Sequence, residues 1–106
     1  MPDRSIEFES ERQLHRLYGE NPENLLEVER SLEVKVVARG NLLRLEGSEE
    51  AMDRCQGFFS LLETAREQGL VRGRFDFLRI LSKVAEGKTE EIEELLRHPL
   101  VLQVDR

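Results

Sequence analysis

Residues 17–47 read LYGENPENLLEVERSLEVKVVARGNLLRLEG, and their spacing predicts a turn, a helix and two strands in that order. The turn is Gly19-Glu20-Asn21-Pro22, in which Gly19 can take the left-handed conformation at little cost. Pro22 cannot continue a preceding helix but suits the first turn of the next one, and Asn21 is the expected N-cap of that next helix. The core-facing stripe of the helix is formed by Leu25, Val28 and Leu32.

The two strands are predicted at Val34–Arg39 and Leu42–Glu46, joined through Gly40-Asn41. Alternation places Val34 and Val36 on the core face, and Lys35 and Arg39 together on the opposite face. A slip of one residue turns every side chain over, so a buried Lys35 beside exposed valines would refute this register.

Elements on the N-terminal side complete the sheet. The alternation of Ser5–Glu9 predicts a third strand, with Ile6 and Phe8 facing the core. Ser10 is the expected N-cap of a helix that runs from about Glu11 to Tyr18 and ends at the glycine turn.

On the C-terminal side, Gly47 ends the hairpin and Ser48 is expected to cap a long helix, about Glu49 to Gln68. Gly57 lies inside this helix at a cost of about 1 kcal/mol, for which we expect close packing against a neighbour. The predicted fold class is α/β of the α+β kind, a three-stranded sheet covered on one face by three helices, with a C-terminal helical tail. The predicted core is Ile6, Phe8, Leu14, Leu17, Leu25, Val28, Leu32, Val34, Val36, Leu45, Met52, Cys55, Phe59 and Leu62.

We expect the chain to divide into an α+β domain at residues 1–70 and a helical connector at residues 71–106. Two short helices are predicted in the connector, the first marked by Phe75 and the second beginning near Thr89 and ending before Pro99. We expect the connector to add little to the core. Its apolar end, residues 100–104, could form a strand.

The charge balance restricts the possible ligands. The chain carries 22 acidic and 16 basic side chains, a net charge of −6. Residues 1–70 hold 15 acidic and 9 basic side chains, whereas residues 71–106 hold 7 of each. This balance argues against a generic basic surface for nucleic acid, so any RNA site must be a local cluster.

Nothing in the sequence indicates a membrane or an oxidising compartment. No apolar run approaches the ~20 residues that span a bilayer, and the first residues, MPDRSIEF, lack the apolar region of a signal peptide. Cys55 is the single cysteine, so no internal disulfide can form. We expect a cytoplasmic protein without a membrane partner.

A series of short motifs runs through the first 47 residues: Leu14, Leu17-Tyr18-Gly19, Asn24-Leu25, Val28-Glu29, Val34-Lys35-Val36, Ala38-Arg39-Gly40-Asn41 and Gly47. With these motifs, about residues 5–70 resemble the first domain of PhoH-family P-loop ATPases, and the order of the elements resembles a KH-type nucleic-acid module. Glu33 departs from the family pattern, in which a glycine commonly ends the helix.

This resemblance implies a larger protein with a C-terminal ATPase domain, which would bind ATP and magnesium, often assemble in rings and act in RNA metabolism. None of that domain is in this chain. Gly87-Lys88-Thr89 does not make a phosphate loop, because Ser82 stands where the motif needs its first glycine. The implied partners are single-stranded RNA, the ATPase domain itself and further copies of the chain.

A KH module holds about four nucleotides with a GxxG turn between two helices. Here the turn keeps its first glycine, but its fourth position is proline and its middle pair carries no basic residue, which weakens the phosphate contact. We predict weak binding of single-stranded RNA, with a log–log salt slope near −2 from about three phosphate contacts. The candidate RNA-binding residues are Arg16, Gly19, Glu20, Asn21, Asn24, Lys35 and Arg39.

The second hypothesis is that the chain does not bind nucleic acid. It would instead be a docking module that binds its own ATPase domain, a neighbouring subunit or a second copy of itself. The acidic net charge and Pro22 favour this alternative. Catalysis finds no support, because Cys55 lies on a buried helix face, and His15 and His98 have no second ligand at metal spacing. We expect no enzymatic activity, metal or cofactor in this chain.

Overall fold

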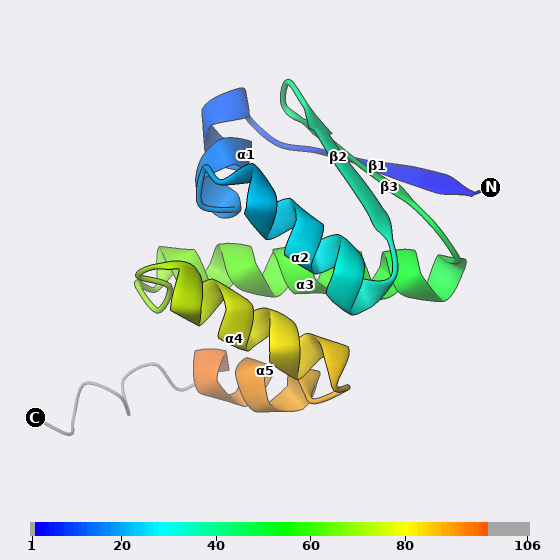
Figure 1. The fold of residues 1–106 in the computed structure, drawn as a ribbon. Coiled ribbons are helices and arrows are strands. Elements are labelled where there is room, and N and C mark those ends of the chain that lie inside the picture. Colours follow the sequence, from blue (N-terminus) through cyan, green and yellow to red (C-terminus); the bar gives the residue numbers. More distant parts are fainter. Residues whose placement is uncertain (1, 98–106) are drawn as a thin grey trace, which may run out of the picture.

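The computed structural model describes residues 2–97 and contains a three-stranded sheet with five helices (Figure 1). The predicted α+β class is confirmed, as is the sequence of elements. The resemblance of this fold to KH-type or PhoH-family domains stays a prediction. The elements are β1 (Asp3–Glu7), α1 (Glu11–Leu17), α2 (Pro22–Leu32), β2 (Lys35–Arg39), β3 (Leu42–Glu46), α3 (Glu49–Glu67), α4 (Arg74–Ala85) and α5 (Thr89–Arg97).

The sheet is antiparallel throughout, with β3 between β1 and β2. The predicted hairpin register is confirmed, because Val34 and Val36 are buried whereas Lys35 is exposed. The first strand begins and ends two residues earlier than the predicted Ser5–Glu9. It ends just before Phe8, the next residue in the same register, which donates its N–H to the Asn41 carbonyl oxygen but accepts on its own carbonyl oxygen from the Asn41 side-chain amide.

Side-chain caps begin the first three helices as predicted. The side-chain oxygens of Ser10, Asn21 and Ser48 accept backbone N–H groups in the first turns of α1, α2 and α3. Glu33 ends α2 in the left-handed conformation with φ of 56°, a backbone shape that glycine adopts most readily at a helix end.

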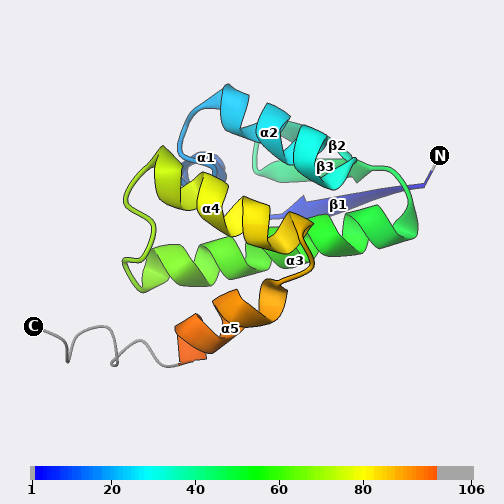
Figure 2. The ribbon, with the colours of Figure 1, turned by 60° about the horizontal axis from the view of Figure 1, so that its bottom comes forward.

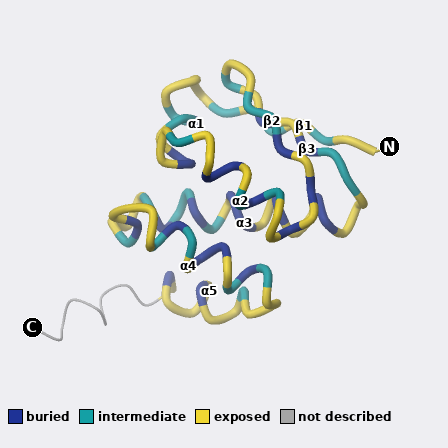
Figure 3. The backbone as a smooth tube through the Cα atoms, in the orientation of Figure 1, coloured by how far each residue is buried: buried dark blue, intermediate teal, exposed yellow. Residues whose placement is uncertain are grey.

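The helices α1, α2 and α3 lie against one face of the sheet, and α4 and α5 form a further layer beyond them (Figures 1 and 2). Twelve of the fourteen predicted core residues are buried, and Ile6 and Phe8 are half-buried. Leu43 and Phe58, outside that prediction, are completely buried as well. Figure 3 shows this burial running through the sheet and the helical layers.

The expectation that residues 71–106 add little to the core is wrong for α4. Phe77 is completely buried and its ring lies edge-on to Phe58 of α3, with 5.5 Å between the ring centres. Ile80, Leu81 and Val84 join the same hydrophobic cluster. The reason is that α4 is amphipathic. Its apolar side must be buried, and it packs against α2 and α3. A domain boundary after residue 70 stays a prediction, and the strand predicted at 100–104 lies outside the described residues.

The expected close packing of Gly57 is also wrong. This residue is exposed, and a Cβ atom placed on it would meet no atom within 4 Å among the described residues.

Candidate functional site

The turn between α1 and α2 uses its own backbone donors to end α1. Gly19 and Glu20 both have positive φ, 80° and 57°. The Gly19 N–H donates to the Arg16 carbonyl oxygen at 3.2 Å, and the Glu20 N–H donates to that of His15 at 2.8 Å. These two N–H groups therefore satisfy the last carbonyls of the helix. A phosphate at the predicted turn would have to compete with both bonds.

The start of α2 is satisfied in a similar way. Asn21 accepts the Glu23 N–H on its side-chain oxygen at 3.0 Å and the Asn24 N–H on its backbone oxygen at 2.9 Å. Pro22 has no N–H to offer. The dipole of α2 remains, but the donors that would meet an anion in its first turn are engaged.

The Asn24 side chain is buried, and its place among the RNA-binding residues stays a prediction. It is only 3% exposed. Its amide donates to the Tyr18 carbonyl oxygen at 2.8 Å, and its side-chain oxygen accepts from the Arg74 Nε at 2.9 Å. The residue thus joins the end of α1, α2 and α4, and we assign it a structural role.

Lys35 and Arg39 lie on the face of the sheet that the helices of residues 2–97 leave uncovered (Figure 1). Together with Val37, Leu42 and Arg44 they line an open depression of about 360 Å³. Arg44 is paired with Asp3 and Glu46. Within residues 2–97, Lys35 and Arg39 have no ion-pair partner. The predicted sharing of one strand face by these two cations is confirmed, since β2 points alternate side chains outward.

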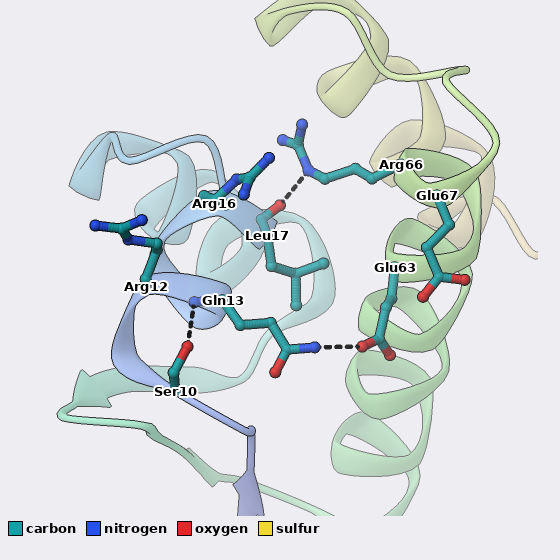
Figure 4. Close-up of a pocket in the computed structure, with 8 residues that line it drawn as sticks. All are labelled: Ser10, Arg12, Gln13, Arg16, Leu17, Glu63, Arg66 and Glu67. Atoms are coloured by element: carbon teal, nitrogen blue, oxygen red, sulfur yellow. Dashed lines mark hydrogen bonds between the residues drawn. The ribbon is translucent and has the colours of Figure 1, made fainter.

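Arg16 lies elsewhere, on the helical side of the molecule. It lines a pocket of about 330 Å³ between α1 and α3, together with Arg12, Arg66, Glu63 and other side chains (Figure 4). The structure therefore divides the seven predicted residues between a turn, a buried anchor, a sheet face and a pocket. It does not bring Arg16 together with Lys35 and Arg39.

Arg66 and Arg12 are the basic residues that the sequence prediction missed. The Arg66 Nε donates to the Leu17 carbonyl oxygen at 2.7 Å. Burial lowers the pKa of the Arg66 guanidinium, and the positive charge of Arg16 lowers it further. Arg12 could have been found, because it stands four residues before Arg16 and the two share a helix face. No local pattern links Arg66 to them.

The one cysteine of the chain is buried inside α3. Burial raises the pKa of the Cys55 thiol to about 12, so this cysteine is a packing group and not a nucleophile. No group of three or more potential metal-ligating side chains occurs among residues 2–97.

No helix in the described range is both long and apolar enough to cross a membrane.

Comparisons with protein families, curated proteins and solved structures found no match to this chain.

Proposed function

We propose that this chain is a weak, sequence-tolerant module for single-stranded RNA that uses the uncovered face of its sheet. One observation carries the proposal: Lys35 and Arg39 lie in one open depression without an ion-pair partner among the described residues. The residues lining that depression include three basic side chains and one acidic one, in a chain with a net charge of −6. This face is a local cationic surface of the kind that RNA requires.

The composition of this surface sets its affinity. Val37 and Leu42 offer apolar contact between the two cations, but no aromatic side chain lines the depression on which a base could stack. Two unpaired cations support about two phosphate contacts. The expected log–log salt slope is then about −1.4, from roughly −0.7 per contact on a single strand. The resemblance to KH-type modules supports RNA as the class of ligand.

The test measures the binding of a fluorescent single-stranded RNA at low and high salt. K35E/R39E should abolish binding and leave the thermal unfolding midpoint unchanged, because both side chains are exposed. R72E/R79E makes the same change of charge at exposed arginines on and beside α4, and it should retain most of the binding. Equal losses in the two variants would reduce the effect to net charge and sink the proposed surface.

Exposed apolar side chains favour protein docking as the second candidate. Phe75 on α4 is 76% exposed and Leu26 on α2 is 54% exposed. If the wild-type chain binds no RNA at low salt but associates with itself or with a PhoH-type ATPase domain, docking is the function and the RNA proposal fails. ATP and magnesium belong to that ATPase domain in either case.

A further inference from the structure

The geometry points to a phosphate-binding pocket between α1 and α3, formed by Arg12, Arg16 and Arg66. This site lies apart from the uncovered sheet face, so it does not rest on the proposed RNA surface. Its ligand is a phosphate group, supplied either by a phosphorylated small molecule or by a nucleic-acid backbone.

The three guanidinium groups come from two elements that the fold brings together. Arg12 and Arg16 stand four residues apart on α1, and Arg66 reaches the pocket from the last turn of α3. Figure 4 shows the Arg16 and Arg66 guanidinium groups at the same end of the pocket, beside the end of α1. No ion-pair partner occurs for any of the three arginines within residues 2–97.

Arg66 is held in place before any ligand arrives. Its Nε donates to the Leu17 carbonyl oxygen, which fixes the guanidinium and leaves its terminal amino groups for another acceptor. One of these, Nη2, lies 3.6 Å from the position that a Cβ atom on Gly19 would occupy, so it lies over the α1–α2 turn. A guanidinium fixed in this way loses little side-chain entropy when it binds an oxyanion.

The electrostatics of the pocket also favour an anion. Burial lowers the pKa of Arg66 and the positive charge of Arg16 lowers it further, so the two like charges lie close enough to repel each other. The pocket also contains two carboxylates, and the Glu63 carboxylate, which keeps its negative charge, is held by a hydrogen bond from the Gln13 amide at 3.1 Å. The Glu67 carboxylate points away from the two guanidinium groups (Figure 4). An anion between Arg16 and Arg66 would relieve their repulsion.

Phosphate suits this arrangement better than a simple halide ion. Guanidinium groups bind phosphate through pairs of parallel N–H donors, and several arginines around one tetrahedral anion can each meet different oxygens. The third cation, Arg12, lines the pocket one helical turn before Arg16, and its guanidinium points away from the other two in Figure 4, so it would contribute to binding mainly through its charge.

The test is a titration of the full chain with inorganic phosphate at constant ionic strength, followed by NMR signals of the backbone and of the arginine side chains. Saturable shifts should centre on Arg16, Leu17 and Arg66, and chloride at equal ionic strength should not reproduce them. R12Q/R16Q should weaken phosphate binding at least tenfold. K35Q/R39Q removes the same charge from the sheet face and should stay within twofold of the wild type.

The outcomes are decisive in both directions. Shifts that do not saturate, or equal weakening in the two double variants, would overturn the pocket. R66K keeps the charge but loses the fixed fork, so it should also weaken binding, and unchanged affinity in R66K would count against the assigned geometry. Unfolding midpoints show whether each variant is folded.

A second arm identifies the source of the phosphate. Single-stranded RNA is added to the chain saturated with inorganic phosphate. Displacement of phosphate from the pocket supports the site and identifies a nucleic-acid backbone as its ligand. Phosphate shifts that persist support the site as one for a small phosphorylated ligand. Phosphate binding without any RNA binding would overturn only the RNA proposal and leave the pocket intact.

Discussion

At the scale of single residues, Gly57 is the clearest place where the sequence can be improved. It lies inside α3, is exposed, and has open space where a Cβ atom would be. Glycine costs about 1 kcal/mol relative to alanine in a helix interior, because it loses more backbone entropy on folding. G57A should therefore raise the free energy of unfolding by about that amount, measured by urea denaturation.

Gly40 is the matched control for this substitution. A Cβ atom there would also meet nothing within 4 Å, but its φ is +62°, in the left-handed region. G40A should thus destabilise the chain by about 1 kcal/mol, since alanine is strained at positive φ. If both alanines shift stability in the same direction, backbone conformation is not the cause.

At the scale of the elements, Asn24 joins three helices through one side chain. It donates to the last residue of the α1 turn, Tyr18, and accepts from Arg74 at the start of α4. N24A should lower the free energy of unfolding by about 1–3 kcal/mol, because it leaves buried polar groups without their partner. N21A removes a cap of α2 and should cost about 1 kcal/mol.

RNA binding by N24A tests the structural assignment of Asn24. RNA binding by folded N24A should equal that of the wild type. A loss of RNA affinity without any loss of stability would place Asn24 back in the binding site.

Periodicity predicted the elements well, because it reports local geometry. The two-residue alternation of a strand predicted that Lys35 and Arg39 share one face of β2 and that Val36 lies on the other. The spacing of apolar residues predicted the buried stripe of α2. The cationic pocket escaped prediction because Arg66 and Arg16 meet only through the packing of α1 on α3. The burial of Asn24 escaped for the same reason, since its partner Arg74 lies 50 residues away. Sequence periodicity alone does not show whether a polar side chain is buried, because its partners come from distant parts of the chain.

At the scale of the whole molecule, the cationic surfaces sit in an acidic chain. The sheet face with Lys35 and Arg39 lies on the side of the sheet away from the described helices, and the pocket with Arg16 lies between α1 and α3. The surrounding acidic side chains oppose a polyanion at longer range, so both proposed sites must act over short distances. Affinity for any phosphate ligand should therefore be modest and specific in position.

One hydrophobic cluster runs from the sheet through α1–α3 into α4 and α5, so the tail and the predicted first domain share a core. Phe77 and Phe75 allow a matched test of this. F77A removes a completely buried ring and should cost about 3–5 kcal/mol, a large share of the 5–15 kcal/mol typical of a domain. F75A truncates a ring that is 76% exposed and should change stability by less than about 0.5 kcal/mol.

The fragment 1–70 extends this comparison to the predicted domain boundary. Without α4, Phe58 loses the ring that packs on it and the apolar sides of α2 and α3 meet water. We therefore expect the fragment to unfold at lower urea and with a broader transition than the full chain. A sharp transition at the midpoint of the full chain, together with a small effect of F77A, would restore the boundary after residue 70. In that case α4 would be a docked connector, held in place by Arg74 and Asn24 and not by its buried face.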